Sequence, residues 1–330
     1  MTSKFNNVYI KDSYTIASVY EKDGPIAEYI DKIYDKDLYY DSDTFEKAEE
    51  KMLHDSIENL IDKVEYKDSD IDYVISGDLE NQIAASDYAL RDFDIPFLGI
   101  FSACATFGEG LLIGANLIEG KRSKNIIVST SSHNMMAEKQ FRNPTEYGAP
   151  KKKTTTWTST GAASILITNK KNKIKITSAT CGRVQDRNVT DVNNMGAVMA
   201  IAAADTIERH LNDLNVKPNY YDLILTGDLG YYGKEILIDY LKTKNIDISK
   251  NYEDCGLILY DIKKQNVFAG ASGPASSALV FCSYLMKEME RGKYKRILLV
   301  PTGAIFSPTR VFQKDSIPSI AHAVSFEVSE

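Results

Sequence analysis

Two stretches of the chain repeat each other, and this internal repeat constrains the fold more than any other feature. The residues Val74–Leu79 (VISGDL) match Ile224–Leu229 (ILTGDL), so the two glycine–aspartate pairs lie 150 positions apart. A second pair of similar apolar runs, 124–130 and 295–302, each follows a helical stretch that ends in glycine. Repeated strand–helix–strand units in this order predict a duplicated α/β architecture.

We therefore expect an α/β fold of two duplicated βαβαβ halves, residues 1–180 and 181–330. Two stretches, 104–120 and 275–291, combine helical character with small and apolar residues on nearly every side. Such helices are usually buried on several sides. We place them as a central layer between two mixed sheets, with amphipathic helices outside, which gives five layers in the order α-β-α-β-α.

Hydrophobic periodicity locates the main elements of the first half. The segment 42–64 keeps apolar residues at helical spacing, and Asp43 and Glu46 resemble a helix start. Short apolar runs predict strands at 73–77, 96–102, 125–129 and 161–168. The periodicity then breaks down over 132–160, which mixes Pro, Gly, Lys, Tyr and Trp, so we expect a long inserted loop of functional importance.

Composition excludes several classes of protein. The 330 residues contain 39 Lys and Arg against 46 Asp and Glu, a net charge of −7, which argues against a nucleic-acid binder. The first residues lack the apolar stretch of a secretory signal, and no apolar run is long enough to span a bilayer, so any membrane association is expected to be peripheral. The four cysteines form no CxxC pair, and we expect neither a metal site nor a cofactor.

Cys104 occupies the position at which a strand passes into a helix. The amides and dipole of a helix N-terminus favour a thiolate, so this position predicts a lowered pKa and a candidate nucleophile. The alternative is a small buried apolar residue, which is common for free cysteine. Cys181, Cys255 and Cys282 lie in strand-like or helical runs and are expected in the core.

The segment after Cys104 suggests an anion site. Of the four histidines, only His133 follows a strand at the sheet edge where ligands collect, so we place it near Cys104. The next residues interleave cations and rings, including Arg142, Tyr147 and Trp157. Such a combination suits a flat anionic ligand, with charge from the cations and stacking from the rings. A solvated basic loop is the alternative, and we prefer it for the lysines at 151–153.

These features together resemble the thiolase superfamily. FSACATFGEGLLIGANLI resembles the nucleophile helix of the 3-oxoacyl synthase III branch, and WTSTGAASILI resembles the strand that closes its first half. A closer resemblance, to the stage V sporulation protein AD family, extends from about residue 23 to 326. The segments that carry it are SSHNMMAEKQFRNPTEYGAPKK, TSATCGRVQD, NNMGAVMAIAAADTI, YYDLILTGDLG, FAGASGPASSALV and TGAIFSPT. The resemblance implies a thiolase-like fold and a homodimer.

The chain departs from the condensing enzymes at their catalytic positions. Those enzymes carry a histidine just after the strand that corresponds to 223–225, whereas this sequence continues Thr226-Gly227-Asp228. The second repeat's counterpart of the Cys104 loop reads Ala271-Ser272-Gly273-Pro274, without the expected asparagine or histidine. Cys104 is thus retained without its base and oxyanion partners, which favours a scaffold that keeps the pocket and has lost the reaction.

The family resemblance implies non-catalytic binding of dipicolinic acid, or its calcium complex, for uptake into the developing spore. It implies other stage V sporulation membrane proteins as partners, and a location in the sporulating cell peripheral to the inner spore (forespore) membrane. The ligand-binding residues that we predict are Cys104, His133, Asn134, Arg142, Tyr147, Trp157, Asp228, Ser272 and Gly303. Two alternatives remain: an acyltransferase or 3-oxoacyl synthase that uses Cys104 as nucleophile, and an assembly component with a vestigial cavity.

Overall fold

The computed structural model describes residues 1–305 and 307–329, and its strands follow the predicted duplication. Ten of them lie side by side in the order β11-β10-β13-β16-β9-β2-β8-β6-β4-β5. Each half of this order, which we call a section, has three parallel strands followed by two strands that pair in antiparallel fashion. The first section contains β5 (Phe97–Gly99), β4 (Tyr73–Gly77), β6 (Asn125–Ser132), β8 (Gly161–Thr168) and β2 (Tyr9–Ala17), and the second contains β11 (Tyr252–Asp254), β10 (Leu223–Thr226), β13 (Arg296–Val300), β16 (Ala323–Val328) and β9 (Ile174–Thr180).

The two sections meet between β2 and β9, where Tyr9 pairs with Lys175 and Ile10 with Ile174. Strand β9 pairs along its length with β16 and so belongs to the second section. The predicted division after residue 180 instead assigns β9 to the first half. The difference arises because β8 and β9 are consecutive in sequence, joined by a short turn, although each runs in its own section.

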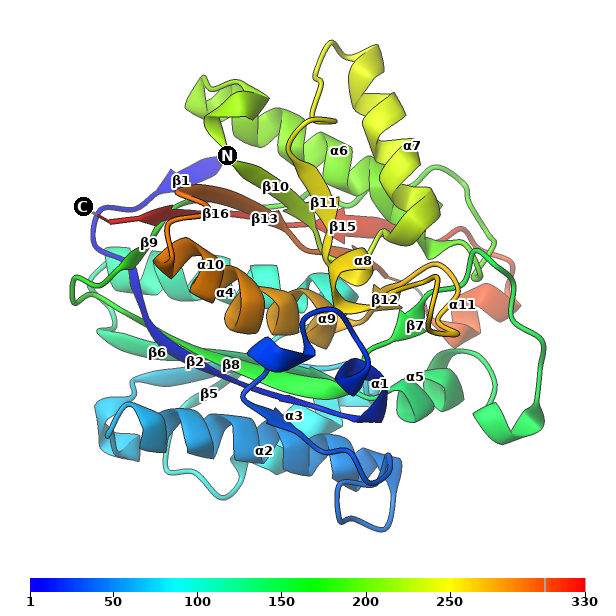
Figure 1. Ribbon diagram of the computed structural model, residues 1–330, viewed down its shortest axis with the longest axis horizontal. Coiled ribbons are helices and arrows are strands. Elements are labelled where there is room, and N and C mark those ends of the chain that lie inside the picture. The colour runs from blue at the N-terminus through cyan, green and yellow to red at the C-terminus, as the bar shows by residue number, and fades with distance from the viewer. Residues whose placement is uncertain (306, 330) are drawn as a thin grey trace.

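Helices form three further layers, as Figure 1 shows. Helix α4 (Thr106–Glu119) lies between the two sections beside a continuous helical run, α9 (Pro274–Leu279), a π-helical turn (Val280–Leu285) and α10 (Met286–Glu290). The outer faces are covered by α2 (Phe45–Lys63) and α3 (Ala84–Leu90) on the first section and by α6 (Met195–Leu214) and α7 (Gly230–Thr243) on the second. The predicted five-layer α-β-α-β-α arrangement is therefore confirmed.

The central layer is packed from both halves of the chain. Phe107 and Leu111 of α4 share one buried apolar cluster with Leu279 and Phe281 of the opposite run. Strands β6 and β8 are buried along their whole length, as expected for strands covered on both faces. The two helices that carry the site residues at their starts are thus held rigidly against each other.

The ends of some elements differ from the sequence prediction. Helix α2 is capped by Thr44, whose hydroxyl accepts a hydrogen bond from the Lys47 amide at 3.2 Å, so the predicted start at Asp43 was one residue too early. Cys181 is exposed rather than in the core, whereas Cys255 and Cys282 are buried as predicted. Cys181 lies just after the last residue of β9, where the chain leaves the sheet.

The predicted inserted loop at 132–160 contains regular structure. It holds α5 (Asn134–Phe141), a 3₁₀ turn (Thr145–Tyr147) and β7 (Trp157–Thr158), which pairs with β12 (Ala271–Ser272) of the second half. The remaining short elements are β1 (Thr2–Lys4), α1 (Val19–Lys22), β3 (Lys32–Ile33), α8 (Cys255–Leu259), β14 (Thr302–Ala304), α11 (Pro308–Phe312) and β15 (Ser319–Ala321), with 3₁₀ turns at 27–29, 68–70, 81–83, 103–105 and 218–220. Among the described residues, no helix combines the length and the apolar character needed to cross a bilayer.

Candidate functional site

Cys104 lies in a 3₁₀ turn (Ala103–Ala105) immediately before α4. Ala103 has φ of 50°, in the left-handed region that residues with a Cβ rarely adopt. Strand β14 of the second half presses against this turn: a Cβ on Gly303 would lie 2.2 Å from the Ser102 carbonyl oxygen. Only glycine allows this approach, so Gly303 fixes the turn that presents the thiol.

Three elements of the second half converge on Cys104. Its thiol is hydrogen-bonded to the carboxyl group of Asp228, which lies two residues after the end of β10 and is almost completely buried. The Thr302 hydroxyl donates to Asp228 Oδ1 at 2.7 Å, and the Gly273 amide donates to Oδ2 at 3.3 Å. The structure thus brings Cys104, Asp228, Ser272 and Gly303 into one neighbourhood, since Ser272 precedes Gly273.

The electrostatics of this neighbourhood oppose a thiolate. Burial raises the pKa of the Cys104 thiol well above its ordinary value, and the adjacent Asp228 charge raises it further. Burial also raises the pKa of Asp228 to about 7, although the Thr302 and Cys104 hydrogen bonds act in the other direction. The predicted lowering of the thiol pKa was therefore wrong, because desolvation and a neighbouring carboxylate outweigh the helix dipole.

A small cavity, the thiol cavity, opens in front of Cys104. It offers about 40 Å³ of open space. Among the described residues around it, Arg142 is the one that carries a charge, and none is a histidine. The cavity is lined by Leu79, Phe101, Ala103, Cys104, Ala137, Phe141, Arg142, Thr158, Met195, Ser272 and Ala304.

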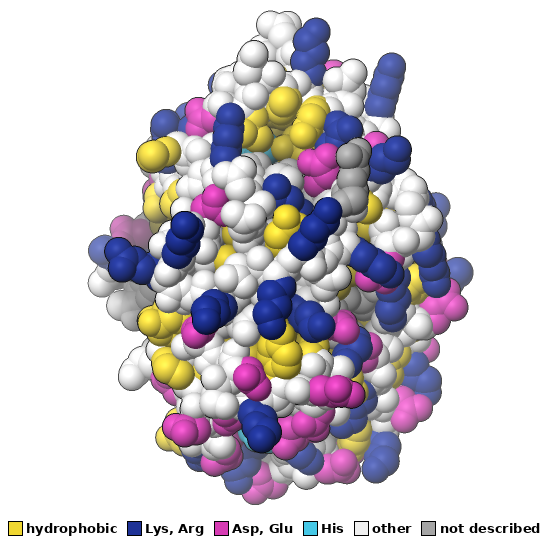
Figure 2. Space-filling model, turned by 90° about the vertical axis from the view of Figure 1, so that its left-hand side faces the viewer, with side chains coloured by type: hydrophobic (Ala, Val, Ile, Leu, Met, Phe, Trp, Pro, Cys, Tyr) yellow, Lys and Arg dark blue, Asp and Glu magenta, His cyan; other side chains and the backbone are white. Residues whose placement is uncertain are grey.

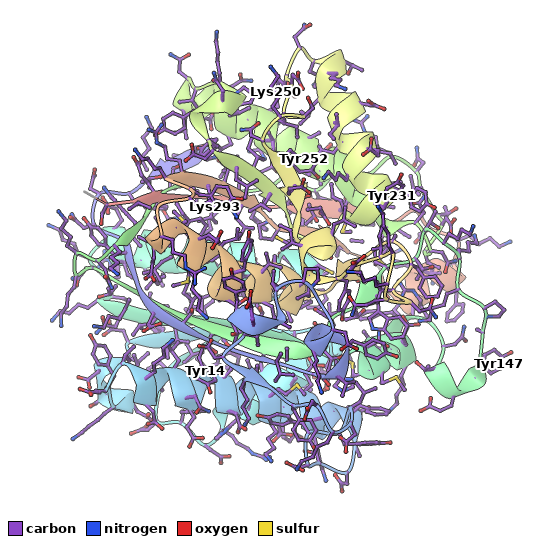
Figure 3. The ribbon with its side chains drawn as sticks, viewed as in Figure 1. Tyr14, Tyr147, Tyr231, Lys250, Tyr252 and Lys293 are labelled. Atoms are coloured by element: carbon purple, nitrogen blue, oxygen red, sulfur yellow. The ribbon has the colours of Figure 1, made fainter. Side chains whose placement is uncertain are left out.

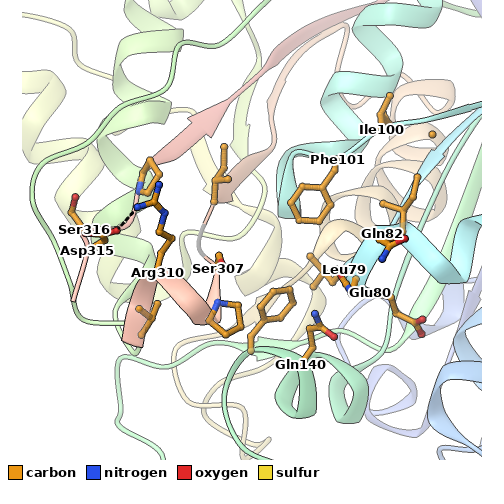
Figure 4. A pocket seen from close by; sticks show the side chains of 18 of the residues that line it. Leu79, Glu80, Gln82, Ile100, Phe101, Gln140, Ser307, Arg310, Asp315 and Ser316 are labelled. Atoms are coloured by element: carbon orange, nitrogen blue, oxygen red, sulfur yellow. Dashed lines mark hydrogen bonds and ion pairs between the residues drawn. The ribbon is translucent and has the colours of Figure 1, made fainter. Parts of the chain in front are cut away.

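A larger open pocket, the vestibule, shares Leu79, Phe101 and Phe141 with the thiol cavity (Figure 4). Its volume is about 850 Å³. Its charged lining residues are Glu80, Asp186, Asp315 and Arg310, and Arg310 is paired with Asp315 at 2.9 Å. The vestibule is therefore acidic overall.

A third pocket, the loop pocket, has a volume of about 800 Å³ and lies along the segment 138–151. It shares Phe141 and Arg142 with the thiol cavity and also contacts Lys151, Trp157 and Phe268. Glu138 pairs with both cations, with Arg142 at 2.6 Å and with Lys151 at 2.7 Å. Within the described structure, Arg142 Nε and Trp157 Nε1 are buried without a hydrogen-bond partner.

Five predicted site residues line neither the thiol cavity nor the loop pocket: Asp228 and Gly303, which lie beside the Cys104 turn, and His133, Asn134 and Tyr147. His133 caps α5: its Nε2 contacts the Leu38 carbonyl oxygen at 2.8 Å, and its Nδ1 accepts from the Met135 amide at 3.2 Å. Burial lowers the pKa of His133 to about 4, so the ring is neutral and cannot oppose a carboxylate as predicted. Asn134 is buried beside it, and Tyr147 is 75% exposed on the outside of the loop (Figure 3).

The sequence interpretation missed two residues of the site. Thr302, which orients Asp228, directly precedes the predicted Gly303 but has no distinguishing pattern. Glu138 stands four residues before Arg142, and this spacing places opposite charges together on a helix, so it could have been found. Lys151, interpreted as part of a solvated basic loop, lines the loop pocket, and its ammonium group lies 5.1 Å from the centre of the Trp157 ring.

Among residues 1–305 and 307–329, one group of possible metal ligands lies elsewhere, on α2. The ligand atoms of His54, Asp55 and Glu58 lie within 4.8 Å of one another. Asp55 already accepts a hydrogen bond from the Tyr40 hydroxyl at 2.8 Å and pairs with Lys32 at 3.4 Å. Because an ammonium group already neutralises this carboxylate, we assign no metal to the group.

The fold defines the class of protein. The chain is similar to a solved structure of OleA from Xanthomonas campestris, with a TM-score of 0.62 at 13% identity, covering 98% of this chain and 99% of that one. It is also similar to 3-oxoacyl-[acyl-carrier-protein] synthase III from Aquifex aeolicus, with a TM-score of 0.57 at 12% identity over 97% and 99% of the two chains. At such low identities the likeness establishes the fold, which is thiolase-like.

The family follows from sequence comparison. The profile of the family described as Stage V sporulation protein AD (SpoVAD) matches residues 1–327. The Stage V sporulation protein AD of Bacillus subtilis (strain 168) is 43% identical over 320 residues, covering 97% of this chain and 94% of that protein. The chain therefore belongs to the stage V sporulation protein AD family, as its sequence motifs predicted.

Proposed function

We propose that this sporulation protein binds dipicolinic acid, as the free acid or its calcium complex, without catalysis, for uptake into the developing spore. The observation that carries the proposal is the position of Arg142. This guanidinium group lines both the thiol cavity and the loop pocket, and its buried Nε has no partner among the described residues. A cation with an unused donor in a pocket is suited to a carboxylate ligand.

The shape of the pockets supports a place for the ligand. Dipicolinate is a flat pyridine ring with two carboxylates. The thiol cavity is too small for it, since sites for small ligands usually measure about 300–1,000 Å³. The loop pocket, about 800 Å³, is large enough. There one carboxylate meets Arg142, and the Trp157 indole N–H supplies a second donor.

The ring of the ligand requires an apolar wall. Lys151 and Tyr20 already lie against the Trp157 ring, Tyr20 with its centroid 4.8 Å away. Phe268 and Phe141 also line the pocket, and we assign them to cover the ligand in place of Tyr147. Cys104 and Ser272 then lie beyond Arg142, at the inner end of the site.

The neighbours of Cys104 support the absence of catalysis. Acyl transfer requires a reactive thiolate and a base within hydrogen-bond reach. Asp228 lies within this reach, but its charge and the burial of the site disfavour the thiolate, and both nitrogens of His133 are engaged elsewhere. Incubation with acyl-CoA donors should therefore leave the mass of Cys104 unchanged. A stoichiometric acyl adduct would instead support the 3-oxoacyl synthase alternative.

The proposal is tested by calorimetric titration with dipicolinate, with and without calcium. We expect saturable binding that Arg142→Ala weakens roughly ten- to a hundredfold, because a charged hydrogen-bond partner is lost. The exposed Arg187, which lines none of the three pockets, offers a matched control, Arg187→Ala. No heat at millimolar ligand would contradict the binding function, and equal affinity of both variants would remove Arg142 from the site.

We also propose that the chain forms a homodimer through β5. This strand ends the sheet series and pairs with β4 alone among the described strands. Such an edge exposes unpaired backbone groups. Leu98 is 38% exposed and Phe101 46% exposed beside it. Sedimentation should give a dimer that Leu98→Glu converts into a monomer, and a wild-type monomer would contradict the proposal.

Membership of the family supports action in the sporulating cell. We propose that the chain works at the periphery of the inner forespore membrane, next to other stage V sporulation membrane proteins. Co-purification from sporulating cells with an integral membrane protein would test this assignment, and a wash at high salt should weaken the association. Recovery of the chain without any membrane protein would contradict it.

A further inference from the structure

One end of the molecule is strongly basic, although the whole chain is acidic. Figure 2 shows Lys and Arg side chains gathered over this face, which lies near the two chain termini, on the left of Figure 1. We call it the basic face. Its residues are Lys4, Lys11, Lys121, Arg122, Lys124, Lys170, Lys171, Lys173, Lys175, Lys293, Lys295 and Arg296.

Strand register explains why these cations gather. Asn125, the first residue of β6, pairs with Thr168, the last residue of β8. Ile174, the first residue of β9, pairs with both Ile10 and Val328. The residues that flank these strand ends therefore lie in one row across β6, β8, β2, β9, β16 and β13. With neighbouring strands about 4.8 Å apart, the row is roughly 24 Å long.

The cations of the basic face are mostly free of acidic partners. In the part of the chain that the structure describes, Lys293 pairs with Glu288 at 2.6 Å and Arg296 with Glu327 at 3.6 Å, and the other ten form no ion pair. Two other carboxylates at this end, one in each repeat, accept hydrogen bonds from backbone amides instead. Asp72 accepts from the amides of Lys124 and Asn125 at 2.5 and 2.9 Å.

In the second repeat, a carboxylate at the equivalent position also accepts hydrogen bonds from two backbone amides. Asp222, 150 residues after Asp72, accepts from the amides of Lys295 and Arg296 at 2.7 and 2.8 Å. In both repeats a carboxylate thus turns inward to hold the start of the neighbouring strand. The adjacent lysine side chains face solvent, and no carboxylate among the described residues pairs with their charge.

We propose that the basic face docks the protein on a membrane surface rich in anionic lipid headgroups. The ten lysines are compact point charges, and together with the two arginines they suit diffuse attraction, which acts within a Debye length of an anionic surface. Binding of single-stranded nucleic acid would need free rings for base stacking. Two rings at this end are already covered by cations, Tyr220 by Arg296 at 4.5 Å and Tyr294 by Lys293 at 5.2 Å.

Docking in this orientation also keeps the ligand pockets open. Cys104 and Asp228 lie at the carboxyl ends of the parallel strands, and the basic face lies at their amino ends. A membrane on the basic face therefore leaves the vestibule and loop pocket on the far side. The inference builds on the proposed peripheral location but does not depend on ligand binding.

Cosedimentation with vesicles tests the proposal on the full chain. We expect binding to vesicles that contain phosphatidylglycerol and none to pure phosphatidylcholine, with loss of binding as salt rises from about 0.1 M to about 0.5 M. The triple variant K124E/K171E/K173E should bind at least a hundredfold more weakly, since each lysine near an anionic surface contributes roughly fivefold. The control K153E/K263E/K314E changes the same charge at exposed positions off this face and should keep binding within about threefold of wild type.

The two triple variants separate the possible outcomes. Equal weakening of vesicle binding in both would show an effect of net charge and overturn the assignment of this face. Tighter binding of wild type to a double-stranded RNA than to the vesicles would also overturn it. Dipicolinate titration of K124E/K171E/K173E should match wild type, which shows a folded protein and separates this inference from the proposed ligand function.

Discussion

The two repeats carry the same Gly-Asp-Leu sequence at the same place and use its aspartate differently. Asp78, after β4, accepts hydrogen bonds from the Ser86 amide at 2.8 Å and the Ser86 hydroxyl at 2.7 Å, which tie it to its own half. Asp228, after β10, instead binds Thr302 and the thiol of Cys104, so it reaches the other half. Duplication therefore supplied two equivalent carboxylates, of which one became part of a site.

The helix starts of the central layer differ in the same way. The first repeat presents Cys104 from a strained turn, and the second presents Gly273, with φ of 99°, whose amide faces Asp228. The two repeats thus contribute complementary groups, a thiol from one and an acceptor with its donors from the other. A single site in a duplicated fold arises from this asymmetry.

The glycines that precede the two aspartates should differ in their tolerance of a side chain, which is the largest effect we expect. A Cβ on Gly77 would lie 2.0 Å from the Ile100 carbonyl oxygen, whereas one on Gly227 would meet its nearest atom, Pro301 Cα, at 3.0 Å. We expect Gly77→Ala to lower the free energy of unfolding by about 3 kcal/mol and Gly227→Ala by about 1 kcal/mol. Urea denaturation measures both, and equal losses would show that the repeats are equally packed.

Removing the charge of Asp228 should expose the reactivity of Cys104. In Asp228→Asn the carboxylate beside the thiol becomes a neutral amide, so the Cys104 pKa should fall and alkylation by iodoacetamide at pH 8 should accelerate about tenfold. Asp78→Asn is the matched control and should leave the Cys104 rate unchanged. Peptide mass spectrometry can measure each rate, with the exposed Cys181 as internal standard.

Unchanged alkylation in Asp228→Asn would mean that burial alone protects the thiol. An increase in both aspartate variants would instead indicate general loosening of the fold, which the rate at buried Cys255 would reveal independently. A selective increase at Cys104 would support a role for Asp228 in keeping the scaffold unreactive.

The architecture could be predicted from the sequence because the repeat and the apolar pattern of each strand are visible in short runs of consecutive residues. The runs around Val74 and Ile224 identified β4 and β10, and the residues 161–168 were predicted with the bounds that β8 has. Strand β9 was assigned to the wrong half, since pairing with β16 depends on residues more than a hundred positions away.

The site was harder to predict because its chemistry depends on contacts between the halves. Cys104 was correctly located, but the partner that raises its pKa lies 124 residues away in the sequence. His133 was placed in the ligand site from its position after a strand, yet both ring nitrogens contact backbone groups of Leu38 and Met135. Neither hydrogen bond leaves a pattern in the sequence.

The pH dependence of stability gives the smallest effect that we expect, and it concerns the aspartate of the second repeat, Asp228. The pKa of Asp228 is about 7 in the folded protein and about 3.9 in an unfolded chain. Between these values the folded state binds more protons, so the contribution of Asp228 to stability falls as pH rises and becomes constant above pH 7. Asp228→Asn removes this contribution.

The difference in melting temperature between Asp228→Asn and wild type should therefore shift in favour of the variant from pH 5 to pH 8, by about 2–4 °C. Replacement of the exposed Asp239 by Asn provides the baseline, since this carboxylate lies on the outside of α7. Differential scanning fluorimetry at both pH values measures the shift. A difference that stays constant with pH would mean that Asp228 is already ionised at pH 5, held by Thr302 and Gly273 more strongly than burial opposes it. In that case the acid at the centre of the site would be a fixed charge, and the thiol beside it would be suppressed at every physiological pH.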